Sequence, residues 1–183
     1  MNIFATSQCP IQCAQEMTDV HVVKMILESA QLLSTAHFVL DGVQVGYKPT
    51  HKNHPCAVWC RTTRSNYSWL YAHFCALLDE FTFRTGKVHK SKEQSKALQS
   101  FPKNLQLGGL TPFTLCVPEE FTGVSNLDVH GRYQAYLNVK FAEWRSRDKP
   151  IKVEWTNRAK PSWATLTVYA QLSTTLQSKL LTY

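Results

Sequence analysis

The chain has no long hydrophobic run. No stretch of its 183 residues approaches the roughly 20 consecutive apolar residues that a membrane-spanning helix needs. Its first residues, MNIFATSQCP, also lack the basic segment and the long apolar core of a signal peptide. Internal repeats and low-complexity runs are missing as well. We therefore expect a protein of the cytoplasm that has no membrane partner.

The chain also lacks the C-x-x-C knuckles that are typical of structural zinc sites. Its six cysteines are expected to stay reduced in the cytoplasm. Two looser C-x3-C pairs occur, and two histidines lie close to the second pair: Cys9/Cys13, Cys56/Cys60, His51 and His54. We expect buried or half-buried thiols and no metal or other cofactor. A metal held near the second pair is the alternative.

The composition, 44% apolar and 11% aromatic, is that of a globular protein with a sizeable core. The net charge of +7 favours polyanionic partners, because cations that face phosphates release condensed counterions. The basic residues gather in separate clusters: 48–54, Arg61/Arg64, 84–92 and 145–152. Each cluster alone suits a solvated face. Interleaved with aromatic residues, they predict binding of DNA or of a nucleotide ligand.

Helical spacing of apolar residues predicts a mainly α, compact single-domain fold with a short extended N-terminal segment at 2–5 and irregular loops. We expect five helices, over 19–38, 55–61, a third that ends at Gly86, 93–99 and 128–144. The third helix is expected to have Ser65 or Asn66 as its N-cap. Residues 10–17 are expected to form a turn. We place the domain at 1–165 and a C-terminal extension of unknown role at 166–183. The oligomeric state is not indicated.

The helix expected over 19–38 carries its larger polar residues on one narrow stripe: His21, Lys24, Glu28, Gln31 and Thr35. Most of its remaining circumference is apolar, whereas a surface helix normally has a wide polar face. Polar groups in a mostly buried helix need partners, because burying them unpaired costs roughly several kcal/mol. A functional cleft is the main interpretation. The alternatives are a polar seam and a buried Lys24–Glu28 ion pair.

His21 and Glu28 are two helical turns apart, about 10.5 Å along the axis. This distance suits two groups that hold separate parts of one ligand. Glu28 suits general acid–base catalysis, and Lys24 between them suits a phosphate. The segment 47–59 places Lys48, His51 and other polar residues before a helix N-terminus, which is a natural anion site. A simple helix cap with solvated cations is the alternative there.

The order of these features resembles that of the T4 endonuclease V type of pyrimidine-dimer DNA glycosylase, and more closely that of uncharacterised phage proteins similar to it. His21 and Glu28 match the histidine and the catalytic glutamate of the family's first long helix. Lys52-Asn53-His54-Pro55 resembles its basic Asn-His-Pro element. Arg158-Ala-Lys-Pro161-Ser-Trp163 resembles its Arg-Pro-x-Trp element. The resemblance extends over about residues 1–165.

The resemblance implies a DNA glycosylase and AP lyase acting on damaged or modified pyrimidines through an imine between the N-terminal amine and the sugar C1′. Glu28 would be the catalytic carboxylate, His21 and Lys24 would position the substrate, and Met1 would supply the amine, since Asn2 does not favour removal of Met1. Where the family has arginines, this helix has Leu27 and Gln31. The expected substrate and phosphate contacts are Lys24, Gln31, Lys48, His51, Lys52, Asn53, His54 and Arg61. The alternatives are a non-enzymatic nucleotide- or nucleic-acid-binding protein, for example one that sequesters a host immune signalling nucleotide, and a purely structural protein.

Overall fold

The computed structural model describes residues 1–164, and within them the regular structure is helical throughout. The elements in chain order are α1 (Pro10–Glu16), α2 (Asp19–Asp41), α3 (Pro55–Cys60), α4 (Arg64–Thr85), the 3-10 helix η1 (Lys90–Gln94), α5 (Ser95–Leu98), α6 (Glu119–Thr122) and α7 (Val129–Ser146). This confirms the mainly α prediction. The extension expected at 166–183 lies outside the described residues. None of the helices in 1–164 combines the length and the apolar character that crossing a bilayer requires.

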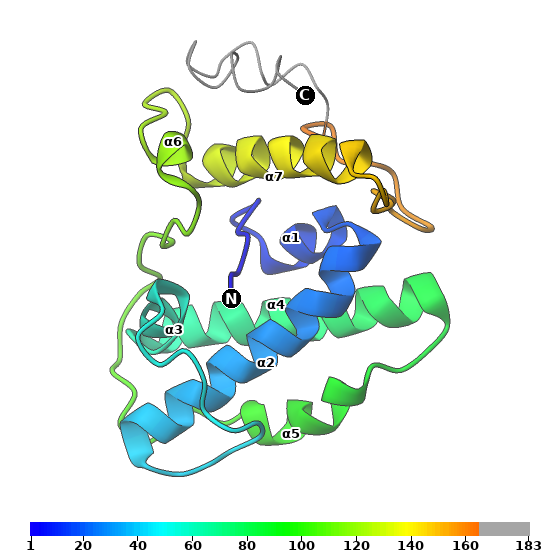
Figure 1. The fold of residues 1–183 in the computed structure, drawn as a ribbon. Coiled ribbons are helices and arrows are strands. Elements are labelled where there is room, and N and C mark those ends of the chain that lie inside the picture. Colours follow the sequence, from blue (N-terminus) through cyan, green and yellow to red (C-terminus); the bar gives the residue numbers. More distant parts are fainter. Residues whose placement is uncertain (165–183) are drawn as a thin grey trace.

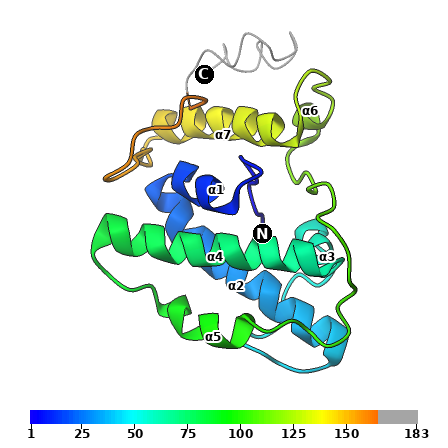
Figure 2. The same ribbon diagram turned by 180° about the vertical axis from the view of Figure 1, so that it is seen from behind.

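The helices are layered, with the start of the chain in the middle. Helices α2 and α4 pack against each other, and α1 packs on α4. Helix α7 lies on the other side of α1 and of the N-terminal residues, and α5 lies beyond α2 and α4 (Figure 1). The view from behind shows the same order of layers (Figure 2). The first residues are therefore enclosed between α7 and the helices below it.

The ends of the long helices follow their capping residues. Thr18 caps α2 by accepting a hydrogen bond from the His21 backbone N–H at 3.3 Å, and Gly42 ends the helix with a φ of 70°. His54 caps α3, and Gly86 ends α4, both as predicted. The prediction for the start of α4 was wrong. Thr63 caps it and accepts from the Asn66 backbone N–H at 3.2 Å, so the cap lies two or three residues before the expected Ser65 or Asn66.

The segment expected as a turn at 10–17 is mostly the short helix α1. Pro10 occupies its first turn, where no backbone N–H is needed, and Cys13 and Ala14 are buried. Residues 2–5 are not helical, as predicted, but Phe4 interrupts their extension with a φ of 50°. Seven residues with two inward-facing side chains give too little periodicity to identify such a helix from sequence.

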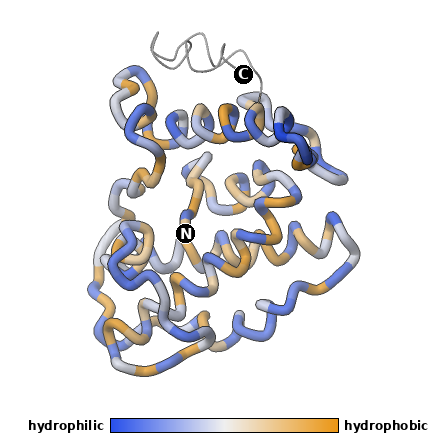
Figure 3. Tube along the Cα trace, viewed as in Figure 1, coloured by the Kyte–Doolittle hydropathy of each residue, from blue (hydrophilic) through white to orange (hydrophobic). Residues whose placement is uncertain are grey.

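Hydrophobic segments occupy the N-terminal residues, α1 and much of α2, whereas the connection before α3 and the end of α7 are hydrophilic (Figure 3). Phe4 is the centre of the contact between the N-terminal segment and α7. Its ring lies 6.1 Å from that of Tyr133 and 6.2 Å from that of Tyr136, and it also contacts His21 at 5.2 Å. Helix α7 thus covers the segment that carries the chain's first residues.

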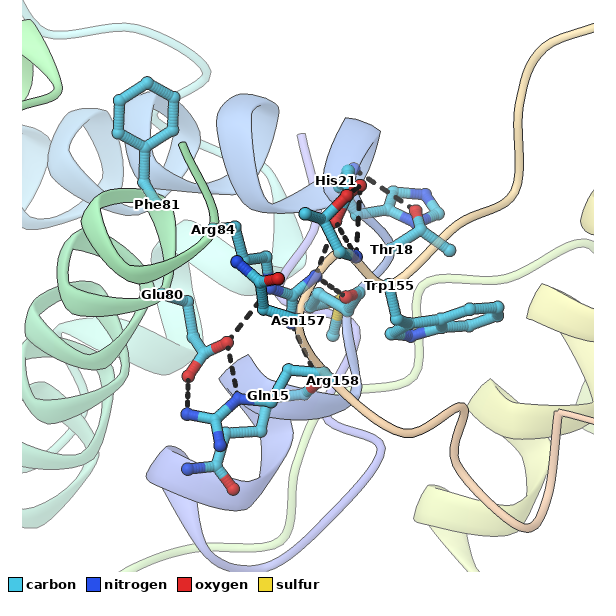
Figure 4. Close-up of polar contacts among 12 residues, drawn as sticks. Gln15, Thr18, His21, Glu80, Phe81, Arg84, Trp155, Asn157 and Arg158 are labelled. Atoms are coloured by element: carbon cyan, nitrogen blue, oxygen red, sulfur yellow. Dashed lines mark hydrogen bonds and ion pairs between the residues drawn. The ribbon is translucent and has the colours of Figure 1, made fainter. Parts of the chain in front are cut away.

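A buried ion network fixes the relative positions of α1, α2 and α4 (Figure 4). The Arg84 guanidinium contacts the Glu80 and Asp19 carboxylates, each at 3.0 Å, and donates to the Gln15 and Met17 carbonyls at 2.9 and 2.7 Å. A second guanidinium, that of Arg158, contacts the same Glu80 carboxylate at 2.6 Å. The arginine of the 158–163 motif therefore joins the later part of the chain to α4.

Candidate active site

The Glu28 carboxylate lies against the start of the chain. Glu28 is 8% exposed, and its Oε2 accepts a hydrogen bond from the Asn2 backbone N–H at 2.7 Å. The α-amine of Met1 lies 3.7 Å from the same oxygen. The polar stripe of α2 thus brings its one carboxylate to the N-terminal amine. The spacing of the stripe in the sequence predicts a functional role for Glu28. It does not predict the hydrogen bond between Glu28 and the Asn2 backbone.

The amine end of Met1 is the more accessible part of that residue. The Met1 side chain is 3% exposed and packs against the core, whereas the residue as a whole is only half-buried. Asn2 holds this position: its Nδ2 donates to the Cys116 carbonyl at 2.6 Å, and its Oδ1 accepts from the backbone N–H groups of Ile3 and Phe4. The amine is therefore held in place by residues of its own segment and of a distant loop.

Lys24 extends from α2 into solvent. Its Nζ lies 3.6 Å from Glu28 Oε1, and its side chain is 68% exposed. The ion pair considered from the sequence therefore exists, but it is not an internal packing contact, because one partner is mostly in water. Because the ammonium is mostly solvated, water screens its attraction to the carboxylate. The ammonium stays accessible to a phosphate beside the carboxylate.

His21 lies among aromatic rings. Its ring centroid is 5.0 Å from that of Trp144 and 5.9 Å from that of Phe141, and its Nδ1 is hydrogen-bonded to Thr18 Oγ1 at 3.0 Å. Burial, with smaller contributions from the charges of Lys140 and Lys24, lowers the pKa of His21 to about 3. No hydrogen bond joins His21 to Glu28 within the described residues. The imidazole is neutral at ordinary pH and packs edge to face with the Phe4 ring.

The basic connection between α2 and α3 is fastened to the same face of α2. Thr35 Oγ1 donates to the Thr50 carbonyl and accepts from the Thr50 N–H, both at 3.1 Å. Ser34 Oγ accepts from the Tyr47 N–H at 3.0 Å. Gln31 is half-buried on the stripe between Glu28 and Thr35. The polar stripe thus anchors the loop at Thr35 and contacts the amine at Glu28, two helical turns earlier.

The loop exposes most of its predicted anion-binding residues. Lys48, His51, Lys52 and Asn53 are exposed, and Arg61 is half-buried. Lys52 Nζ lies 4.4 Å from the centre of the Phe38 ring, and Arg61 Nη1 donates to the Lys52 carbonyl at 2.7 Å. These contacts order the loop while leaving its cations on the surface.

His54 has a different environment from the rest of the loop. Its Nδ1 accepts from the Cys56 N–H at 3.2 Å, so the capping interpretation is correct for this residue. Burial, the N-terminal ammonium and His51 together lower its pKa. His54 therefore lies near the amine that Glu28 contacts. Its side chain also forms, with Cys56 and Cys116, a group of three possible metal ligands.

The described residues thus form a helical domain that holds its N-terminal amine against a nearly buried carboxylate, beside surface cations. Comparison with known families shows the class of protein. The family model of pyrimidine dimer DNA glycosylase matches residues 1–94, and the chain belongs to this family. No curated protein and no solved structure matches the chain. The matched residues include Met1, Glu28 and the basic loop, and they end in η1.

Proposed function

We propose that the protein is a DNA glycosylase and AP lyase that acts on damaged or modified pyrimidines. The observation that carries this proposal is the distance of 3.7 Å between the Met1 amine and Glu28 Oε2. Membership of the pyrimidine dimer DNA glycosylase family supports the substrate class. The exposed cations of the loop that precedes α3 support a duplex-backbone contact.

In the proposed reaction the amine of Met1 attacks C1′ of the target nucleotide, the C1′–N bond of the base breaks, and the base leaves with the bonding electrons. The amine loses protons as the sugar ring opens, which gives an imine to C1′. Glu28 accepts a proton from the amine and returns one to the sugar ring oxygen. Loss of a C2′ proton then expels the 3′ phosphate by β-elimination, and water releases the enzyme. In this scheme Met1 supplies the nucleophile, Glu28 accepts and returns the protons, including that of C2′, and water is the remaining reactant.

The remaining predicted residues have supporting roles in this proposal. Lys24, Gln31 and the loop residues Lys48, His51, Lys52, Asn53 and Arg61 engage phosphates near the lesion, whereas His54 Nδ1 is bonded to the Cys56 N–H. His21 acts through Phe4, by holding the N-terminal segment, and does not touch the substrate. Its burial among aromatic rings is the reason for this assignment.

Either of two amines could serve the same carboxylate. If Met1 were removed, the Asn2 nitrogen, which lies 2.7 Å from Glu28 Oε2, would become the chain's amine. We keep Met1 as the proposed nucleophile because Asn2 does not favour its removal. The intact mass of the purified protein decides between the two forms and must accompany any assay.

The test is borohydride trapping on labelled duplex DNA that is either UV-irradiated or abasic. Wild type should form a covalent adduct, and acetylation of the N-terminal amine should abolish it. Glu28→Gln should reduce trapping by about 100-fold, the size of a typical general acid–base contribution. Glu143→Gln is the matched control, since this carboxylate lies on the exposed surface of α7, and it should trap like wild type. An adduct that survives amine blocking would contradict the imine proposal.

A second candidate is a non-enzymatic nucleotide- or nucleic-acid-binding protein on the same fold. The observation that favours it is that Leu27, beside Glu28, is 40% exposed where the family has an arginine. An apolar surface beside cations suits base contacts without catalysis. The same experiment separates the two candidates. Absence of any adduct, with binding to DNA or a nucleotide intact and unchanged in Glu28→Gln, would select the binding protein.

A further inference from the structure

Three metal-ligating side chains meet beside the N-terminal segment. One ligand atom each from His54, Cys56 and Cys116 lies within 4.8 Å of the other two. Cys56 is fully buried, and the other two residues are half-buried. The sequence suggested Cys56 and Cys60 as a pair, but the structure places Cys56 with a cysteine from a different part of the chain.

The separation of the two sulfurs fits a shared metal ion better than it fits a disulfide. Cys56 Sγ lies 3.5 Å from Cys116 Sγ. A disulfide requires about 2.05 Å. Two thiolates on one tetrahedral zinc, each about 2.3 Å from the metal, lie roughly 3.8 Å apart. The observed sulfur pair needs a shift of only a few tenths of an ångström to accept such an ion.

The protein holds these ligands in place through several elements. His54 and Cys56 belong to the first turn of α3, where the His54 side chain caps the helix. Cys116 comes from the irregular connection before α6, yet both of its backbone polar groups are bonded. Its N–H donates to the Tyr133 hydroxyl at 3.0 Å, and its carbonyl accepts from Asn2 Nδ2 at 2.6 Å. Helix α7 and the N-terminal segment thus present Cys116 to the other two residues.

We propose that His54, Cys56 and Cys116 form a zinc site with one open coordination position. One imidazole and two thiolates are a donor set that zinc favours, and sites with three protein ligands keep the fourth position for water or another small ligand. His54 Nδ1 accepts from the Cys56 N–H, so the proton of the neutral imidazole lies on Nε2; when the ion binds, Nδ1 exchanges this hydrogen bond for the metal. The ion would tie the start of α3 to the connection that holds Asn2.

The first experiment is metal analysis of the full-length protein, purified under reducing conditions and equilibrated with zinc. Wild type should retain one zinc per chain, and Co²⁺ in its place should give sulfur-to-cobalt charge-transfer absorption and the strong visible bands of tetrahedral coordination. Cys116→Ser should weaken zinc binding by at least about 10–100-fold, the loss that even outer-shell changes cause. Cys75→Ser, which alters another half-buried thiol, is the matched control and should bind like wild type.

A second measurement, cysteine alkylation, uses only the wild-type protein, so its result does not depend on whether the variants fold. Zinc added to wild type should slow alkylation of the half-buried Cys116 and leave that of the exposed Cys9 unchanged. Absence of stoichiometric zinc, or equal zinc binding by Cys116→Ser, would overturn the site. So would a Cys56–Cys116 disulfide that forms under mild oxidant at the same rate with and without zinc. Glu28→Gln should still bind zinc, so this proposal and the proposed function can fail separately.

Discussion

At the scale of single residues, His21 makes stability depend on pH. Burial is the main reason why its pKa is lowered to about 3, while a histidine in the unfolded chain titrates near 6.5. Between these values the unfolded state binds one more proton than the folded state does. The free energy of unfolding therefore rises with pH by about 1.4 kcal/mol per unit, and acidification through this window removes that stability. Above pH 6.5 the contribution is constant.

His21→Phe tests this linkage, because phenylalanine suits the aromatic surroundings and cannot take up a proton. Urea unfolding at several pH values between 4 and 5.5 should show a slope smaller than that of wild type by about 1.4 kcal/mol per pH unit. His51→Phe, at an exposed position, is the control and should keep the wild-type slope. The prediction is wrong if both variants have the same pH dependence as wild type.

At the scale of elements, Gly46 determines how the basic loop leaves α2. Gly42 and Gly46 have nearly the same left-handed φ, 70° and 71°, but a Cβ on Gly42 would meet nothing within 4 Å. A Cβ on Gly46 would lie 2.6 Å from Ser34 Oγ, which already bonds the Tyr47 N–H and the Ala30 carbonyl. The second glycine is therefore required for space as well as for conformation.

Gly42→Ala should cost about 1–2 kcal/mol of unfolding free energy, the penalty of a left-handed alanine. Gly46→Ala should cost about 1–3 kcal/mol more, because of overpacking against Ser34. It should also weaken DNA binding, since the loop with Lys48 and Lys52 would shift. Denaturant unfolding and binding titrations on both variants measure the two effects. Equal losses in the two alanine variants would contradict the steric argument.

The elements also show how far the sequence could predict the structure. Helix α2 was predicted nearly from end to end, because its cap at Thr18 and its exit at Gly42 are local signals. The start of α4 was not, since Thr63, Ser65 and Asn66 are all capable caps and only the surroundings select one. Glu28 was predicted to be a site residue because it lies on the polar stripe of α2. Its contact with the N-terminal segment depends on folding, and no local pattern encodes it.

Long-range contacts explain the other differences. Cys116 lies in an irregular connection, so nothing near it in sequence indicates that it meets Cys56. Glu80 and Arg84 fit a helical i,i+4 pair, but their partners Asp19 and Arg158 come from distant segments. From the sequence alone, charged residues at this spacing predict a solvent-exposed helix face. Their burial becomes evident only when α1, α2 and α4 are packed together.

At the scale of the whole molecule, the net charge of +7 predicts DNA binding that weakens as salt rises. The logarithm of the binding constant should fall linearly with the logarithm of salt concentration. Lys52→Ala should reduce the magnitude of that slope by about 0.9, the change for one phosphate contact on a duplex. Lys103→Ala, at an exposed position outside the basic clusters, is the control and should leave the slope unchanged. Identical slopes for wild type and Lys52→Ala would remove Lys52 from the DNA interface.

The enclosure of the N-terminal segment has a consequence for biosynthesis. The Thr6 carbonyl accepts from Gln134 Nε2 at 2.9 Å, the Ala5 carbonyl is bonded to His130, and Asn2 is bonded to the Cys116 carbonyl. The partners of these first residues are thus translated more than a hundred residues later. A nascent chain still on the ribosome has made the α-amine but has no α7 to hold it beside Glu28. These contacts of the first residues can therefore form only after α7 has been synthesised, so an unfinished chain lacks them.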